Sequence, residues 1–225
     1  TAEIAIKRGI PTKVKYFGIK TAQKLLAEGH KADLLLGNNV LAHVPDINDF
    51  VKGMKIILSD EGVITMEFPH LYQLIKQNQF DTIYHEHFSY LSFTTAKQIF
   101  EASGLEMFDV EELSTHGGSL RVFAKHFGDK TKEISPNVKE LIEKEEAEGI
   151  TDIEYYHGFQ KTCDKIKSDF LSFILEARKD GKKIAGYGAA AKGNTLMNYC
   201  RIKKDDISYV VDANPHKQNK YLPGI

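Results

Sequence analysis

The segment Tyr-His-Glu-His-Phe-Ser-Tyr at 84–90 contains the residue types best suited to acid–base chemistry. Tyr84, His85, Glu86 and His87 are consecutive ionisable residues with aromatic side chains around them. The interiors of strands and helices rarely contain such a run, whereas general acid–base catalysis needs several polar groups that converge in a partly dry pocket. We therefore interpret the segment as an active-site loop. The alternative is an aromatic loop whose histidines only cap backbone groups.

The two histidines of this segment also raise the question of a metal site. In an extended segment, His85 and His87 would point to the same side, because side chains alternate along a strand. The spacing is not the helical His-Glu-x-x-His pattern, and no further cluster of histidine or cysteine supports a site. We therefore expect no metal in this chain.

A second group of polar residues follows the apolar run at 33–37. The sequence Asn-Asn-Val-Leu-Ala-His-Val-Pro-Asp occupies 38–46 and contains Asn38, Asn39 and His43. In open parallel sheets, ligands bind beyond the carboxyl ends of the strands. These side chains are therefore candidates to bind a polar ligand, and a turn followed by a helix N-cap is the alternative.

A glycine turn precedes a helical pattern near the end of the chain. Residues 186–194 read Gly-Tyr-Gly-Ala-Ala-Ala-Lys-Gly-Asn. Glycines let the backbone approach a phosphate, and a helix N-terminus offers free N–H groups. The spacing departs from the G-x-G-x-x-G fingerprint of dinucleotide sites. The turn is therefore either structural or part of a phosphate or nucleotide site, and Lys192 and Asn194 favour the latter.

The loop at 114–119 lies between two strand patterns. It is rich in glycine and serine, as an ordinary hairpin loop would be. His116 within it and Arg121 just after it would also be able to reach a ligand. The sequence favours neither reading over the other.

The composition is that of a globular protein with nearly balanced charge. Hydrophobic residues make up 42% of the 225 residues, and 30 basic residues face 31 acidic ones. This balance gives no electrostatic reason to expect nucleic acid or an anionic membrane as a partner. No stretch approaches the roughly 20 apolar residues that span a bilayer. Two cysteines and the lack of a signal pattern favour a cytoplasmic protein, and the first residues are typical of a fragment.

The first half of the chain alternates helix and strand patterns, which predicts an α/β fold with a parallel sheet covered by helices. Thr95 and Gln98 form a capping box for a helix that ends near Gly104. The strands expected at 105–110 and 120–127 should pair antiparallel at the sheet edge. The expected elements are helices at 21–28, 51–58 and 95–103, a buried parallel strand at 33–37, and strands at 62–68, 105–110 and 120–127.

The second half begins with a charged segment. Residues 139–148 predict a solvated helix, and a capping box at Thr151 predicts an amphipathic helix of about 28 residues that would bridge two domains. A second α/β unit follows, with strands expected at 183–187 and 207–212 and a helix at 189–200. We therefore divide the chain into 1–129, a helical linker at 130–181, and 182–225.

Four of these motifs occur in the same order in one family. The segments at 38–46, 84–90, 115–121 and 186–194, together with 210–224, resemble the S-adenosylmethionine-dependent C-methyltransferases that act on nucleotide-linked deoxysugars. The resemblance implies that 1–129 is a Rossmann-like class I methyltransferase domain without its first strands. It also implies that 182–225 begins a second Rossmann-like domain. Zinc is expected only in the family's N-terminal cysteine-rich domain, which this chain lacks.

The resemblance also implies roles for single residues. His87 would be the general base, and Tyr84, Glu86 and His43 would line the sugar site with it. Asn38 and Asn39 would lie near the methionine end of the cofactor. The residues implied to bind the nucleotide-sugar are His116, Arg121, Gly186, Gly188, Lys192 and Asn194.

The implied reaction is methyl transfer to C3 of a nucleoside-diphosphate 4-keto-deoxysugar. A ketone at C4 acidifies the C3 proton, and a histidine is suited to remove it and form an enolate. Two alternatives are an oxidoreductase that uses the Gly186 turn for a nicotinamide cofactor, and a non-catalytic nucleotide-sugar-binding fragment. The unusual glycine spacing disfavours the first, and the missing glycine-rich cofactor loop of the family favours the second.

Overall fold

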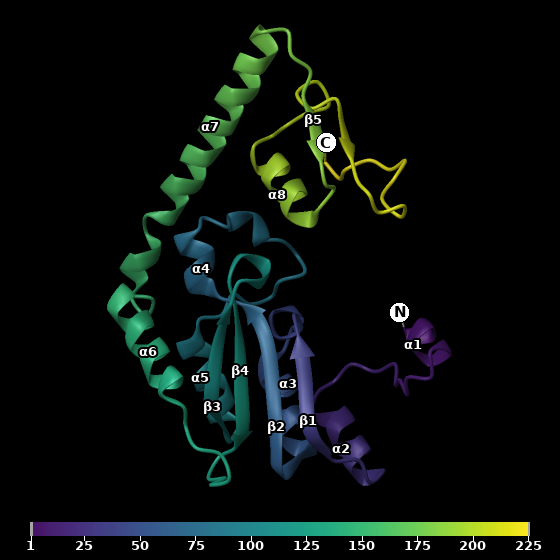
Figure 1. Cartoon of the computed structure of the whole chain (residues 1–225), viewed down its shortest axis with the longest axis vertical. Coiled ribbons are helices and arrows are strands. Elements are labelled where there is room, and N and C mark those ends of the chain that lie inside the picture. Colours follow the sequence, from purple (N-terminus) through teal and green to yellow (C-terminus); the bar gives the residue numbers. More distant parts are fainter. Residues whose placement is uncertain (1, 225) are drawn as a thin grey trace.

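The computed structural model describes residues 2–224, which form two β-sheets joined by a helical segment (Figure 1). The helices are α1 (Ala2–Lys7), α2 (Ile19–Ala27), α3 (Ile47–Ile57), α4 (Leu71–Lys76), α5 (Phe93–Ala102), α6 (Pro136–Glu148), α7 (Phe159–Lys179) and α8 (Ala191–Tyr199). The strands are β1 (Ala32–Asn38), β2 (Leu58–Pro69), β3 (Leu105–Leu113), β4 (Ser119–His126), β5 (Ala185–Tyr187) and β6 (Tyr209–Val211).

The first sheet has the strand order β1-β2-β4-β3. β1 and β2 are parallel, and β4 is antiparallel to both of its neighbours. The expected parallel β-α-β unit and the antiparallel pair at the other edge are both confirmed. Since β1 and β2 end at the same edge, their carboxyl ends lie together, and in Figure 1 they face the C-terminal unit.

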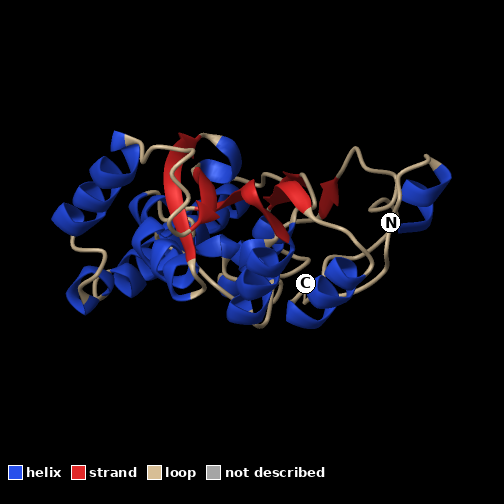
Figure 2. Ribbon diagram, turned by 90° about the horizontal axis from the view of Figure 1, so that it is seen from below, coloured by secondary structure: helices blue, strands red, loops and turns tan. Residues whose placement is uncertain are grey.

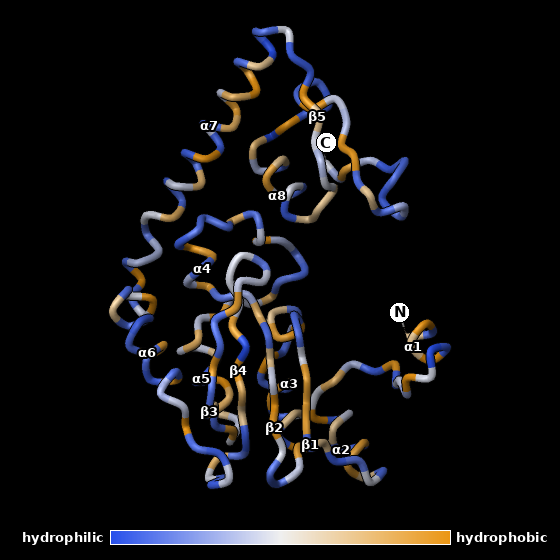
Figure 3. Tube along the Cα trace, in the orientation of Figure 1, coloured by the Kyte–Doolittle hydropathy of each residue, from blue (hydrophilic) through white to orange (hydrophobic). Residues whose placement is uncertain are grey.

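The main core lies between one face of this sheet and the helices behind it. Ile64, Met66 and Phe68 of β2 alternate onto that face and are buried, as the period of two in a strand requires. Helices α3 and α5 contribute further buried residues, including Met54 and Phe100. Figure 2 shows helices gathered along one face of the sheet, and Figure 3 shows apolar residues concentrated along its strands.

The other face of β1 is open. Leu34 is 54% exposed and Leu36 is 71% exposed. The expectation of a strand buried on both sides is therefore wrong for this chain, because within residues 2–224 no element covers that side of β1. A continuous apolar run indicates two apolar faces but does not indicate which element covers each of them.

Two helix predictions are wrong in part: the N-cap predicted for α5 and the solvent exposure predicted for α6. α5 begins after Ser92, whose hydroxyl accepts a hydrogen bond from the backbone N–H of Thr95, so Ser92 and not Thr95 is the N-cap. α6 is not fully solvated as expected, because Val138, Leu141 and Glu145 are buried. Since one of its three inward residues is acidic, the apolar pattern of α6 was too weak to predict a buried face.

The single long linker helix predicted from Thr151 is also wrong. A short 3₁₀ helix at Ile153–Tyr156 is capped by Asp152, and α7 begins only after Gly158. A glycine inside a helix lowers its stability by about 1 kcal/mol relative to alanine, so interrupting the helix at Gly158 costs little free energy. The linker therefore consists of α6, a turn and α7.

The C-terminal unit contains the expected strand, helix and strand. β5 and β6 are parallel and α8 lies between them in sequence. Ile174 of α7 packs here with Cys200 and Ile202, so α7 is attached to this unit. Two short strands do not amount to a Rossmann-like domain, so the second such domain and the three-part division remain predictions.

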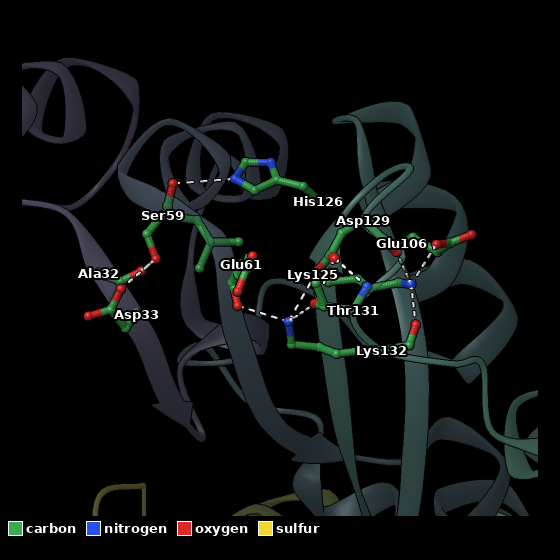
Figure 4. Close-up of polar contacts among 11 residues, drawn as sticks. Ala32, Asp33, Ser59, Glu61, Glu106, Lys125, His126, Asp129, Thr131 and Lys132 are labelled. Atoms are coloured by element: carbon green, nitrogen blue, oxygen red, sulfur yellow. Dashed lines mark hydrogen bonds and ion pairs between the residues drawn. The ribbon is translucent and has the colours of Figure 1, made fainter.

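A polar network ties the lower end of the sheet to the loop after β4 (Figure 4). The buried Lys125 ammonium donates to the backbone oxygens of Asp129 and Lys132, both at 2.6 Å. Lys132 Nζ in turn donates to the Glu61 carbonyl at 2.8 Å and to the Asp129 carboxylate at 3.1 Å. The Thr131 hydroxyl and N–H, together with Lys132, hold the pKa of the Asp129 carboxyl well below its usual range.

This network predicts a dependence of stability on pH. Because the folded-state pKa of Asp129 is depressed, its contribution is present above the ordinary carboxyl pKa of about 4 and is lost as the pH falls. Asp129→Asn should therefore flatten the fall in the free energy of unfolding between neutral and acidic pH, measured by urea denaturation. Asp60→Asn is the matched control, since Asp60 is fully exposed and pairs only with Lys31. Equal pH dependence in wild type and Asp129→Asn would contradict this role.

The described residues contain neither a helix suited to span a membrane nor a cluster of side chains suited to bind a metal ion. In 2–224, no helix combines the length and apolar character needed to cross a membrane. Over the same residues, no three histidine, cysteine or acidic side chains come together in a way that would hold a metal ion.

Candidate active site

The aromatic segment 84–90 forms turns between a 3₁₀ helix at Phe80–Thr82 and α5. It is attached to the segment that follows β1, because the Phe88 N–H donates to the Ala42 carbonyl at 2.8 Å. Ala42 belongs to a 3₁₀ helix at Leu41–His43. The two motifs that the sequence separates by some forty residues therefore lie together at the carboxyl end of β1.

His87 lies at the centre of an aromatic group that we call the His87 cluster, which consists of His43, Tyr84, His87 and Tyr90. The His43 and His87 rings meet edge to face at 4.7 Å between centroids. The Tyr84 ring stacks on His87 at 4.5 Å, and the Tyr90 ring meets it edge-on at 6.0 Å. The structure therefore brings together three of the four residues predicted to be catalytic.

A backbone carbonyl determines the tautomer of His87. Its Nδ1 lies 2.8 Å from the oxygen of Thr82. A carbonyl oxygen only accepts, so Nδ1 carries the proton and donates it, and in the neutral ring Nε2 has the free lone pair. The imidazole is thereby oriented with its basic nitrogen away from Thr82.

The two tyrosines of the cluster are held in their protonated form. Burial raises the pKa of the Tyr84 hydroxyl, and the carboxylates of Glu86 and Asp81 raise it further. Burial also raises the pKa of Tyr90. Both hydroxyls are thus hydrogen-bond donors at neutral pH. Tyr90 was not among the predicted site residues, although it is the last residue of the same motif.

Glu86 differs from its neighbours. It is exposed, and no group among residues 2–224 donates a hydrogen bond to its carboxylate. Its carboxylate acts on Tyr84 through charge. A direct role in catalysis therefore remains a prediction.

The loop between β3 and β4 reaches the end of β1. Asn39 Nδ2 lies 3.1 Å from His116 Nε2, so the amide donates and the ring nitrogen accepts. Both residues have left-handed backbone, with φ of 52° at Asn39 and 54° at His116. Such conformations are uncommon outside glycine and are concentrated at functional sites. Asn38, at the end of β1, is exposed beside them.

Arg121, predicted to bind a ligand, is engaged by two carboxylates. Its Nη2 lies 3.0 Å from Glu67 and its Nη1 lies 3.2 Å from Glu111. Glu67 was not among the predicted site residues, although it stands in the otherwise apolar end of β2 and is only 5% exposed. An acidic residue inside an apolar strand was the signal that would have indicated it.

The glycine turn lies in the C-terminal unit. Gly188 has φ of 91°, which glycine adopts without strain. The carboxylate of Asp212, at the end of β6, accepts the Ala189 N–H at 2.7 Å, and backbone N–H groups lower its pKa. Gly186 and Asn194 lie in the same unit, on β5 and α8.

Among residues 2–224, Lys192 and Tyr199 of the C-terminal unit contact the half of the chain that carries the His87 cluster. Lys192 Nζ lies 3.4 Å from the backbone oxygen of His116. The Tyr199 ring meets Phe80 at 5.0 Å between centroids. Phe80 begins the 3₁₀ helix that contains Thr82, so α8 is in contact with the segment that orients His87.

Two family models match this chain, one in each half. Residues 5–110 match the family model described as a methyltransferase domain, and residues 114–225 match the model described as the C-methyltransferase C-terminal domain. Over nearly its whole length this chain is similar to C-methyltransferases. The C-methyltransferase NovU of Streptomyces niveus is 34% identical over 223 residues, which cover 99% of this chain and 53% of that protein. The chain thus spans about half the length of this curated relative.

Solved structures resemble this chain more distantly. An S-adenosylmethionine-dependent methyltransferase of Thermotoga maritima gives a TM-score of 0.41 at 18% identity, covering 55% of this chain and 68% of that one. One from Clostridium acetobutylicum gives 0.39 at 10% identity, covering 56% and 69%. The assignment of a Rossmann-like class I methyltransferase fold rests on the β1–β2 unit and on the family model over 5–110.

Proposed function

We propose that the protein containing this chain transfers a methyl group from S-adenosylmethionine to carbon C3 of a nucleoside-diphosphate 4-keto-deoxysugar. The observation that carries the proposal is the geometry of His87, whose Nε2 is left basic by the Thr82 carbonyl. A carbon nucleophile must be made by removing a proton from carbon, and an imidazole is suited to this at neutral pH. Similarity to C-methyltransferases supports the class of reaction.

In this proposal His87 Nε2 removes the C3 proton and the C4 oxygen becomes an enolate. The Tyr84 hydroxyl, which is protonated at neutral pH, donates to that oxygen, and His43 and Tyr90 exclude water around it. The ring contacts fix His87 in one orientation, so the positioning of base and carbon supplies part of the rate.

The residues at the end of β1 fit the cofactor. Asn39 donates to His116, and its Oδ1 has no hydrogen bond to any described residue. This oxygen and the amide of Asn38 match the ammonium and carboxylate of a methionine moiety, so Asn38 and Asn39 would hold that end. S-adenosylmethionine supplies an electrophilic methyl group there.

The C-terminal unit would bind the nucleotide end of the substrate. A cavity of about 940 Å³ lies beside β6 and is lined by Asp212, Lys217 and Tyr221, among others. A carboxylate at a strand end accepts hydrogen bonds from ribose hydroxyls, and a lysine neutralises phosphate. Lys192, at the contact between the halves, is placed to meet the diphosphate between nucleotide and sugar.

The alternatives make different predictions. An oxidoreductase would need a dinucleotide fingerprint at the Gly186 turn, which the spacing does not provide, and the family match is to C-methyltransferases. A non-catalytic nucleotide-sugar-binding fragment would have no use for a basic Nε2 in an aromatic cluster. The geometry of His87 therefore favours an enzyme.

The test is a product analysis with the complete gene product. Incubation with S-adenosylmethionine and a dTDP-4-keto-6-deoxyhexose should give a sugar with one added methyl group at C3, identified by mass spectrometry and NMR. The matched control substrate is the corresponding 4-hydroxy sugar, whose C3 proton is not acidified and which should stay unchanged. Methylation on oxygen, or equal reaction of both sugars, would contradict the enolate route.

A further inference from the structure

Glu67 is a buried carboxylate that the proposed reaction does not use. It lies at the carboxyl end of β2, in register with Asn38 of β1 on one side and Arg121 of β4 on the other. Its Oε2 accepts from Arg121 Nη2 at 3.0 Å, and its Oε1 accepts from the Thr115 hydroxyl at 3.0 Å. Removing a carboxylate from water costs free energy, so buried carboxylates are found where they are paired with a cation and hydrogen-bonded.

The two side chains that bind Glu67 lie on either side of His116 in the sequence. Thr115 precedes His116, and Arg121 follows the loop on β4. His116 has φ of 54°, and Gly117 and Gly118 continue with φ of 85° and 118°. A left-handed conformation at histidine is unfavourable by itself, so tertiary contacts must hold it. Glu67 supplies one of those contacts, through the Thr115 hydroxyl.

The same loop joins both halves of the molecule to the end of β1. His116 Nε2 accepts from the Asn39 amide, and the His116 carbonyl accepts from Lys192 of α8. The Asn39 N–H donates to the backbone oxygen of Glu67 at 2.8 Å. Glu67 thus contacts Asn39 through its backbone and the His116 loop through its side chain.

We propose that Glu67 is a positioning residue that holds the His116 loop against Asn39 and Lys192, and so joins the cofactor end of the site to the C-terminal unit. The cofactor role of Asn39 rests on the function proposed above, whereas the positioning of the loop does not. Arg121 acts in this arrangement as the counter-charge of Glu67.

Arg121 provides a matched control for this proposal. Glu111 also pairs with Arg121, at 3.2 Å, but its side chain is about half exposed, and within residues 2–224 its hydrogen bond is to Arg121 and not to the loop 114–118. Glu67→Gln removes the charge and places an amide N–H₂ or a weaker acceptor against Arg121, while Glu111→Gln removes only an exposed pair. Both variants therefore remove one negative charge beside Arg121. They differ because Glu67, but not Glu111, also accepts a hydrogen bond from Thr115 of the loop.

The first measurement is hydrogen exchange by NMR on the complete gene product without ligand. The reporters are the N–H of Gly118, bonded to Thr115, and that of Asn39, bonded to Glu67. Glu67→Gln should speed exchange at both by about tenfold, as expected for loss of a charge-assisted hydrogen bond, and Glu111→Gln should leave them unchanged. Unchanged exchange in Glu67→Gln, or equal acceleration throughout the sheet, would overturn the proposal.

The second measurement links the loop to ligand binding through a double-mutant cycle. Glu67→Gln and His116→Ala should each weaken S-adenosylhomocysteine binding, and the double variant should be no weaker than His116→Ala within about twofold. Additive losses would overturn the coupling through His116. If the protein binds no S-adenosylhomocysteine, the proposed function fails while the hydrogen-exchange result still decides the role of Glu67.

Discussion

Replacing His87 by asparagine should lower the rate of methyl transfer by about 10²- to 10⁴-fold, the usual contribution of a general base. Asparagine retains an N–H₂ group that can donate to the Thr82 carbonyl, so the turn should stay intact. It has no basic nitrogen, so the C3 proton should remain on the sugar. Affinity for S-adenosylhomocysteine, measured by calorimetry, should stay near that of wild type.

The proton step can be measured apart from methyl transfer. In D₂O, with S-adenosylhomocysteine in place of the methyl donor, the wild-type protein should exchange the C3 hydrogen of the keto sugar for deuterium. His87→Asn should lose this exchange, observed by NMR of the sugar. His85→Asn is the matched control, because His85 is the exposed neighbour outside the His87 cluster. Full exchange by His87→Asn would remove His87 from the proposed mechanism.

The second large effect is expected at Glu145 of α6. Its side chain is fully buried and accepts four hydrogen bonds at 2.6–2.8 Å. These come from His70 Nε2, from the backbone N–H groups of Phe93 and Thr94 at the start of α5, and from the Thr94 hydroxyl. Glu145 therefore ties the linker to the end of β2 and satisfies free N–H groups of a helix N-terminus.

Glu145→Ala should lower the free energy of unfolding by about 3–5 kcal/mol, because it leaves a buried histidine and several N–H groups without partners. At roughly 2–4 °C per kcal/mol for a chain of this size, the unfolding midpoint should fall by about 10 °C. Glu143→Ala is the control on the same helix, since Glu143 is exposed and pairs only with Lys139. Its midpoint should change by no more than about 1–2 °C. Equal midpoints for the two variants would contradict the role of Glu145.

The same carboxylate should contribute to acid sensitivity. Burial alone would raise the pKa of Glu145, but the hydrogen bonds from His70 and Thr94 outweigh it and leave the pKa below its usual range. A depressed folded-state pKa means that its contribution is present above the ordinary carboxyl pKa and is lost as the pH falls. Glu145→Ala should therefore lose more stability at neutral pH than in acid.

The effect of Glu145 would extend to the candidate site. The His70 backbone N–H donates to the Gly118 carbonyl at 3.1 Å, and the Leu71 N–H donates to the Leu91 carbonyl at 3.0 Å. His70 and Leu71 thus join the His116 loop and the end of the aromatic segment to α6. Destabilising this junction should loosen both segments at once.

The sequence by itself determined which local segments carry the chemistry. The run at 84–90 was identified because its residue types are costly in a strand or helix, and 38–46 because it follows an apolar strand. The parallel β1–β2 unit and the β3–β4 hairpin were also predictable, since period and turn residues act over a few neighbours. The order of four such motifs was sufficient to indicate the family.

Only the tertiary structure decided how those segments act together. The contacts of His43 with His87, of Glu67 with Arg121 and Thr115, and of His70 with Glu145 join residues 44 to 75 positions apart. Each of these contacts depends on which strand ends and helix faces lie next to one another in the fold. The periodicity of hydrophobic residues along the sequence does not specify that. The buried Glu145 resembles the solvated acidic residues around it in sequence, because its burial becomes favourable only when distant partners supply its hydrogen bonds.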